Sequence, residues 1–366
     1  MAKTLFKKKK KNPVKIIFIV FLIILAVFSV LSFVIVKINF DDIFGRTVLD
    51  TNTYYLRYSD IEENYPRELI SFMSGENKLQ GYLYGAENTK GLVVICHGLG
   101  GGAENYTAQT ISFVDAGYKV FGYDNTGCYN SEGANCIGLA HSVTDLDAAL
   151  TFIEGESRFE GLPVYLYGHS WGGYAVTAIF NYDHDIAASV SVAGFNKPMQ
   201  MIIEWARGMM GGFAYVEYPY IWLYQKTIFG NDLDVTAVDG INSTDTPIMI
   251  VHGTEDHTIG FEESAIIAYR DEITNPNVKY SVWDNEHQNG HSTVFLSQEA
   301  TLYADELDEE YDRIYDEYNG DIPEDIEKAF FDGTDKVKAS ELNKELTEEI
   351  LEFFDAVNYK KSGEAA

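Results

Sequence analysis

One serine in this sequence has neighbours that would make it a nucleophile. Residues 168–172 read Gly-His-Ser-Trp-Gly, so Ser170 lies at the centre of a G-x-S-x-G pattern. A short apolar run, 163–167, precedes the pattern, and an apolar run with helical spacing, 174–180, follows it. At such a strand-to-helix turn the serine takes a strained backbone conformation, and glycines beside it avoid clashes. The pattern therefore predicts a serine that can attack a carbonyl carbon and form an acyl-enzyme.

A serine hydroxyl is a poor nucleophile unless a base lies within hydrogen-bond reach and an acid orients that base. Asp256 follows the predicted strand 247–251, while His287 and His291 follow the next predicted strand, 278–283. We expect Asp256 to be the acid and His291 the base, because His291 follows a glycine and directly precedes a long helix. His287 is the alternative base. The chain order is then nucleophile, acid, base.

A glycine-rich loop could stabilise the negative charge that develops on the attacked carbonyl oxygen. Residues 97–102 form this loop, directly after the predicted strand 92–96. Glycines let backbone N–H groups approach an oxyanion closely. We expect the N–H groups of Leu99 and of Trp171, the residue after the serine, to form the oxyanion hole. His97 is interpreted as a structural histidine that braces the loop.

The elements that must position these residues alternate between strands and helices. Short apolar strands separated by amphipathic helices predict a mostly parallel sheet with helices on both faces. Ligands bind such sheets at the carboxyl ends of the strands, where every candidate residue falls. The predicted strands are 67–74, 78–84, 92–96, 119–123, 163–167, 187–192, 247–251 and 278–283, with helices at 106–116 and 142–153 among them.

The alternation is interrupted at 195–245, a segment rich in aromatic residues and methionine. This composition indicates a helical cap that forms a lid over an apolar pocket. A long amphipathic helix with an acidic face is predicted at 294–318, and a last helix at 341–357, with Ser340 as its cap. The acidic face is read as a solvated surface, because no segment has the spacing of a calcium loop. We therefore expect no metal ion.

The first residues differ in kind from the rest of the chain. Residues 1–15 contain seven lysines, and the uncharged run 16–36 would span about 31 Å as a helix, close to the thickness of a bilayer core. The lysines predict that residues 1–15 form a cytoplasmic tail and that 16–36 form a single-pass signal-anchor in the cell membrane. The rest of the chain is then extracytoplasmic and begins with a juxtamembrane connector at 37–66. A cleaved signal peptide is the alternative, but its apolar region would be shorter.

Charge and cysteine content limit the partners of the remaining chain. The first 37 residues hold eight of the 27 basic residues and none of the 56 acidic ones, so the rest has a formal net charge of −37. Such a surface repels nucleic acid, which we therefore exclude as a partner. Cys128 and Cys136 lie eight positions apart and could form a disulfide outside the cell or stay reduced.

Together these motifs resemble the α/β-hydrolase superfamily of serine hydrolases over about residues 67–358. Similar arrangements occur in monoacylglycerol-lipase-like esterases and in prolyl-oligopeptidase-like peptidases. The resemblance implies an eight-stranded sheet and a cap after the sixth strand. The long acidic helix after the histidine departs from the family pattern. The motifs that carry the resemblance are His97-Gly98, the loop 124–133, residues 168–173, His252-Gly253 with Asp256, and Gly290-His291.

The resulting hypothesis is a membrane-anchored serine hydrolase that cleaves carboxylic esters with Ser170, His291 and Asp256 and needs no cofactor. The partner is then a small-molecule ester. A serine peptidase of the same fold, acting on short peptides, is the alternative, and Glu204 or Glu217 in the cap could hold the charged amino terminus of its substrate. A non-catalytic binding module is a further hypothesis.

Overall fold

The protein is built around one eight-stranded sheet. The computed structural model describes residues 12–364, with side chains as far as Val357. The strands are β1 (Arg67–Ser74), β2 (Asn77–Tyr84), β3 (Leu92–Cys96), β4 (Lys119–Tyr123), β5 (Val164–His169), β6 (Ala188–Val192), β7 (Ile248–Gly253) and β8 (Val278–Trp283). Their spatial order is β1-β2-β4-β3-β5-β6-β7-β8, in which β2 runs antiparallel to both neighbours and all other pairs are parallel. The predicted fold class is confirmed.

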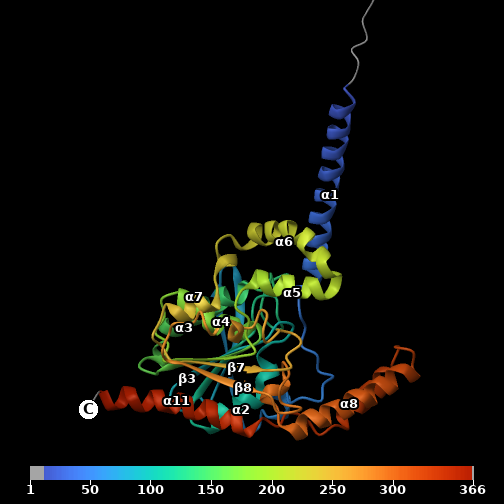
Figure 1. Ribbon diagram of the computed structural model, residues 1–366. Helices are drawn as coiled ribbons and strands as arrows, with labels where there is room; N and C mark the ends of the chain where they lie inside the picture. The colour runs from blue at the N-terminus through green and yellow to red at the C-terminus, as the bar shows by residue number, and fades with distance from the viewer. Residues whose placement is uncertain (1–11, 365–366) are drawn as a thin grey trace, which may run out of the picture.

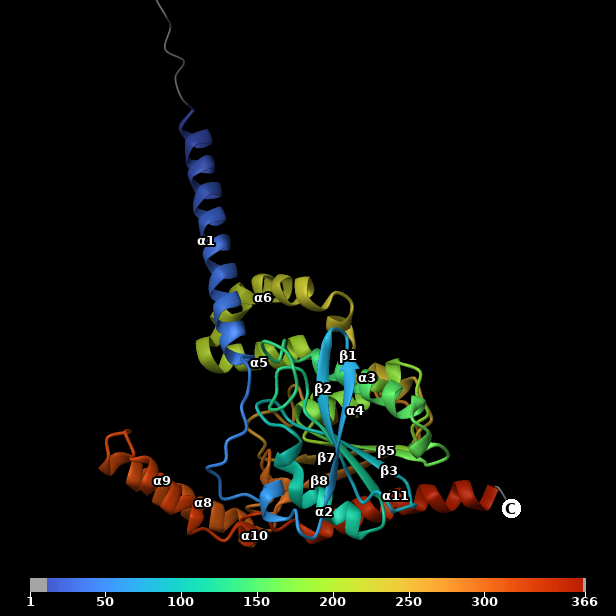
Figure 2. The same ribbon diagram turned by 180° about the vertical axis from the view of Figure 1, so that it is seen from behind.

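Helices cover both faces of the sheet, as Figures 1 and 2 show. One face carries α3 (His141–Gly155), α4 (Trp171–Ala178) and α7 (Ala237–Asn242), and the other carries α2 (Thr107–Asp115) and α11 (Lys344–Glu364). Two apolar cores result, one on each side of the sheet. The central strands β3, β5, β6 and β7 are almost wholly buried, and β3 accordingly is a continuous apolar run, whereas β6 alternates valine with two buried serines, Ser189 and Ser191.

The chain after the sheet contains more helices than the sequence pattern predicts. The helix expected from residue 294 begins only at α8 (Gln298–Glu317), because Ser297 caps it by accepting a hydrogen bond from the N–H of Ala300. Two short helices follow, α9 (Glu324–Asp332) and α10 (Lys336–Ala339). Together α8 and α9 project from one side of the domain (Figure 2).

The predicted cap of the last helix is wrong. Helix α11 begins at Lys344, where the side chain of Asn343 accepts a hydrogen bond from the N–H of Leu346 at 3.2 Å. Ser340 has another role, because its hydroxyl oxygen accepts the N–H of Leu56 at 2.9 Å. This bond ties the chain before the sheet to the chain after it.

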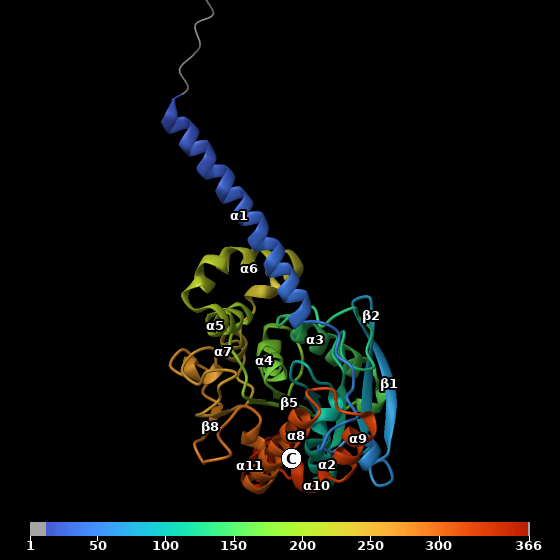
Figure 3. The same cartoon turned by 90° about the vertical axis from the view of Figure 1, so that its right-hand side faces the viewer.

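The apolar N-terminal run lies within one long helix, α1 (Pro13–Ile43), which is long and apolar enough to cross a membrane by length and composition. The helix extends past the predicted end of the span, and its first half projects away from the domain (Figures 1 and 3). Most of the lysines expected to form the cytoplasmic tail lie outside the described residues.

The cap consists mainly of α5 (Pro198–Met210) and α6 (Ala214–Phe229), followed by α7. Helix α6 lies against the second half of α1 in all three views (Figure 3). Polar and aromatic contacts join the two helices. Ser32 donates to Glu217 at 3.0 Å, the hydroxyl groups of Ser29 and Tyr220 lie 2.9 Å apart, and Tyr224 donates to Asp41 at 2.6 Å.

The connector between α1 and the sheet is packed against the domain rather than free. The N–H of Cys136 donates to the carbonyl oxygen of Phe44, and the N–H of Thr47 donates to that of Gly127. Cys128 and Cys136 are thiols in the structure, and their sulfur atoms lie 3.3 Å apart in this same region. The connector therefore has a fixed path from α1 into the domain.

Candidate active site

Ser170 lies in a strained turn between β5 and α4, at the centre of the sheet. Its φ of 57° and ψ of −113° are unusual for a residue with a side chain. The neighbouring strand holds the turn, because the N–H of Ser170 donates to the carbonyl oxygen of Val192 at 2.8 Å. A Cβ atom on Gly168 would overlap the backbone of Gly172, and one on Gly172 would overlap the backbone of Cys96. Both glycines of the motif are therefore required by close backbone packing.

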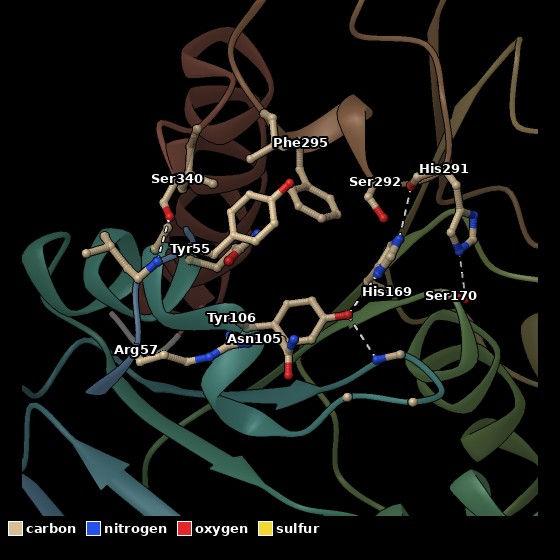
Figure 4. A pocket seen from close by; sticks show the side chains of 18 of the residues that line it. Tyr55, Arg57, Asn105, Tyr106, His169, Ser170, His291, Ser292, Phe295 and Ser340 are labelled. Atoms are coloured by element: carbon tan, nitrogen blue, oxygen red, sulfur yellow. Dashed lines mark hydrogen bonds between the residues drawn. The ribbon is translucent and has the colours of Figure 1, made fainter. Parts of the chain in front are cut away.

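His291 and Asp256 lie next to Ser170 in a chain of hydrogen bonds, which Figure 4 shows in part. The His291 Nε2 atom is 2.9 Å from the Ser170 Oγ atom, and its Nδ1 atom is 2.8 Å from Asp256 Oδ2. Since the carboxylate can only accept, Nδ1 carries the proton and Nε2 is free to accept the serine proton. His287 lies apart from this group, with its ring 3.9 Å from Glu286.

Asp256 is buried and fully hydrogen-bonded. Its Oδ1 atom accepts the N–H groups of Thr258 and Ile259, each at 2.9 Å. Its Oδ2 atom accepts from His291 and lies 3.2 Å from His252 Nε2. Burial alone would raise the pKa of this carboxyl, but these hydrogen bonds outweigh burial and hold the pKa below its usual range. Asp256 therefore stays ionised and can orient an imidazolium at His291.

The two backbone N–H groups expected to form the oxyanion hole belong to different elements. Trp171 is the first residue of α4, and Leu99 lies in the loop after β3. Within the described residues, neither N–H donates to a protein acceptor. Unpaired N–H groups at a helix start and in a glycine-rich loop can bind a developing oxyanion. The positive end of the α4 dipole acts in the same direction.

His97 is buried beneath this loop and braces it. Its Nδ1 atom donates to the carbonyl oxygen of Gly98 at 2.7 Å, and its Nε2 atom accepts the N–H of Asn125 at 2.9 Å. Burial lowers the pKa of His97 to about 4, so the ring is neutral near pH 7. This geometry agrees with a structural histidine.

A second hydrogen-bond chain joins the glycine-rich loop to the backbone of His291, and sequence reasoning missed it. The N–H of Gly98 donates to the Tyr106 hydroxyl at 2.9 Å, and that hydroxyl donates to His169 Nδ1 at 2.8 Å. His169 Nε2 in turn donates to the carbonyl oxygen of His291 at 3.0 Å (Figure 4). Burial lowers the pKa of His169 to about 3, so the ring stays neutral and keeps both roles.

A cavity of about 440 Å³ opens beside Ser170. Its walls come from the connector, from the loop and helix after β3, and from the segment after β8. No residue of the cap, 195–245, is among the described residues that line it. The expectation that the cap forms a lid over the substrate pocket is therefore wrong. The lining includes Tyr55, Leu56, Arg57, Leu99, Asn105, Tyr106, Gln109, His169, Ser170, His291, Ser292, Phe295, Ser340 and Leu342.

Tyr55, Leu56 and Arg57 were not predicted as site residues, because the connector has no regular pattern. The adjacent tyrosines at 54 and 55 are the one available signal, since paired aromatic residues are unusual in a solvated tether.

The two cap carboxylates do not face this cavity. Glu204 accepts the N–H groups of Gly260 and Ser264, at 2.9 and 3.1 Å, and so holds the loop that follows Asp256. Glu217 is buried against α1. The suggestion that either residue binds the amino terminus of a peptide is therefore wrong.

Comparison with known proteins agrees with the fold. The model of the family described as serine aminopeptidase, S33, matches residues 87–238. The quorum-quenching protein AidA of Acinetobacter baumannii is 29% identical over 141 residues. That match covers 36% of this chain and 46% of AidA, so it spans less than half the length of this relative.

A solved esterase structure from Pyrococcus furiosus has the same architecture. It superposes with a TM-score of 0.52 and 18% sequence identity over 75% of this chain and 97% of the esterase. A second crystal form of that esterase gives a TM-score of 0.50 over 68% of this chain and 90% of its own. At these identities the likeness shows the fold alone.

Tyr106→Phe tests whether the second hydrogen-bond chain positions the site. The substitution leaves the Gly98 N–H and His169 Nδ1 without their buried partner, so both loops should lose their fixed geometry. We expect kcat for 4-nitrophenyl butyrate to fall by about 10- to 100-fold with little change in KM.

Tyr65→Phe is the matched control, because it removes a surface hydroxyl that bonds Asp115. Both variants are compared with the parent by urea unfolding. A Tyr106→Phe enzyme with the parent's kcat, or one that loses activity only in proportion to its unfolded fraction, would contradict a positioning role.

Proposed function

We propose that the chain is a serine hydrolase of the α/β-hydrolase superfamily in which Ser170, His291 and Asp256 form a triad that cleaves carboxylic esters. The observation that carries the proposal is the unbroken chain of hydrogen bonds from Asp256 through His291 to Ser170. A hydroxyl, a base and an acid come from the ends of three different strands of the sheet. A complete set of these groups supports a catalytic role over a purely binding one.

The reaction follows from the positions of the protons. As the Ser170 Oγ atom attacks the acyl carbon, His291 Nε2 takes its proton, and the oxyanion accepts the N–H groups of Leu99 and Trp171. His291 then protonates the departing alkoxide, and the acyl group stays on Ser170. A water molecule then attacks this acyl-enzyme and gives a proton to His291, which passes that proton to the Ser170 Oγ atom as the acid leaves. Asp256 stabilises the imidazolium in both halves.

The cavity supports esters over amino-terminal peptides. An aminopeptidase has to bind a protonated amine, usually with carboxylates. No aspartate or glutamate is among the described residues that line the cavity. Peptidase activity remains the alternative, and the match to the serine aminopeptidase model favours it.

We place α1 across the membrane, with the catalytic domain outside the cytoplasm. Residues 13–27 extend beyond the α1–α6 contact by only about 22 Å, whereas a bilayer core is about 30 Å thick. The span must therefore continue to about residue 32, beside α6. The cap would then contact lipid through exposed apolar side chains, which include Phe213, Tyr215, Val216, Trp222 and Leu223. This arrangement explains why the cap does not line the cavity.

Ser170→Ala should lower kcat for 4-nitrophenyl esters on the order of 10⁴-fold or more, because no other group can carry the acyl chain. The parent enzyme should hydrolyse these esters with a higher kcat/KM than aminoacyl or prolyl 4-nitroanilides. Both panels are measured by release of the chromophore.

Ser157→Ala, at an exposed turn, is the control and should keep the parent's rate. Ester hydrolysis that survives Ser170→Ala would reject the triad. A preference for the anilides that depends on Ser170 would favour the peptidase.

The membrane placement predicts that the full chain resists carbonate extraction and that protease added to intact cells digests the domain. In vesicles of brominated phosphatidylcholine, tryptophan fluorescence should be quenched mainly through Trp222, which is 39% exposed on α6. Trp222→Phe should remove most of the quenching.

Trp283→Phe is the matched control, because Trp283 lies buried in β8. Protection of the domain from protease would reject the orientation, and a mature chain beginning after residue 36 would identify a cleaved signal peptide. Quenching unchanged in Trp222→Phe would show that α6 does not reach lipid through Trp222.

A further inference from the structure

The cavity beside Ser170 ends in a buried cation. Figure 4 shows Ser170 and His291 at one end of the cavity and Tyr55, Arg57 and Ser340 at the other. Arg57 is only 8% exposed. Apolar side chains also line this cavity, among them Leu56, Phe295 and Leu342.

Arg57 has no carboxylate partner within the described residues. Its Nη1 atom donates to the backbone carbonyl oxygen of Glu104 at 3.3 Å, and its Nε atom is buried without an acceptor. The carboxylate of Glu104 is already taken, because it pairs with Arg67 at 2.9 Å. Arg67 also lies over the rings of Tyr58 and Tyr82. Arg67 therefore has a carboxylate partner, whereas the neighbouring Arg57 has none within the described residues.

An unpaired buried guanidinium is costly, and arginine cannot escape the cost by losing its proton. Burial of such a group at the end of a substrate cavity is therefore a reason to expect an anion there. The rest of the domain is strongly acidic, so its surface does not attract anions. Recognition of an anion would have to occur inside the cavity.

We propose that the substrate carries a carboxylate that binds Arg57 while its ester carbonyl lies between Ser170 and the N–H groups of Leu99 and Trp171. This inference rests on the proposed esterase function and names its substrate class. A carboxylate fits better than a phosphate monoester, because a single guanidinium balances one negative charge and matches the planar fork of a carboxylate. The Ser340 hydroxyl, which accepts the N–H of Leu56, still has its proton to donate at this end.

The test compares carboxylate esters with neutral esters of nearly the same shape. One pair is the 4-nitrophenyl monoester of adipic acid and its methyl ester, which place the charge on the acyl side. The other pair is 4-butanoyloxybenzoate and its methyl ester, which place it on the leaving group. In at least one pair, the parent enzyme should have a higher kcat/KM for the carboxylate ester than for the neutral ester. Arg57→Gln should reduce the ratio of kcat/KM for carboxylate over neutral ester at least about tenfold.

Arg158→Gln is the matched control, because Arg158 is an exposed arginine paired with Glu68 and Glu156. Arg57→Lys, which keeps the charge and loses the fork, should fall between the parent and Arg57→Gln. A ratio unchanged in Arg57→Gln, or a parent that prefers the neutral ester in both pairs, would overturn the inference. Loss of Ser170-dependent hydrolysis for all four esters would instead reject the proposed function.

A second measurement does not depend on the folding of a variant. Benzoate and phenyl phosphate are tested as competitive inhibitors of the parent, with benzamide as the neutral control. Stronger inhibition by benzoate supports the carboxylate. Equal inhibition by benzamide, or stronger inhibition by phenyl phosphate, overturns it.

Discussion

The site depends on one strained turn at the centre of the sheet. Ser170 has a positive φ because β5 must end and α4 must begin within a single residue, and the neighbouring strand holds the serine N–H in place. Strain of this kind costs about 1–3 kcal/mol and persists only when the surrounding packing enforces it. The packing here comes from the two motif glycines, each of which lies against backbone. This turn exposes the Ser170 hydroxyl and leaves the N–H of Trp171 without an acceptor in the described residues.

Three loops from three strands must meet this turn to within hydrogen-bond distance, and buried polar groups fix them. His252 and two backbone N–H groups orient Asp256, and Glu204 of the cap holds the loop that follows. His169 and Tyr106 join the glycine-rich loop to the backbone of His291. The histidine of the G-x-S-x-G motif therefore links the nucleophile turn to the loops on both sides.

Much of the fold could be predicted, because the sheet imposes its pattern on the sequence. The central strands are buried on both faces, so 92–96 and 120–123 appear as runs without charged residues, and the strands predicted at 92–96 and 119–123 have the correct bounds. The order of serine, aspartate and histidine followed from the same strand ends. Loop chemistry favoured His291 over His287 as the base, and the structure places His291 rather than His287 beside Ser170; its role as the base is a proposal.

What the sequence did not reveal depends on contacts between distant segments. The aromatic and methionine content of the cap suggested that it covers the pocket. Such side chains pack equally well against substrate, lipid or another helix, so composition alone could not distinguish these surroundings. In the structure α6 packs against α1. These two helices are far apart in the sequence, so no local sequence pattern predicts their contact. Arg57 lies in an irregular connector, and its burial depends on residues more than 40 positions away. The Ser340 hydroxyl likewise bonds the distant Leu56, whereas Asn343 caps α11.

The proposed triad makes Ser170 an activated nucleophile only in the folded protein. Labelling with a fluorophosphonate, followed by intact mass and peptide mapping, measures this activation. We expect a single adduct on Ser170 in the native protein and none after unfolding in urea, because only the folded site brings His291 and Asp256 to the serine. A native protein that gains no adduct, or gains one on another serine, would show that Ser170 is not activated.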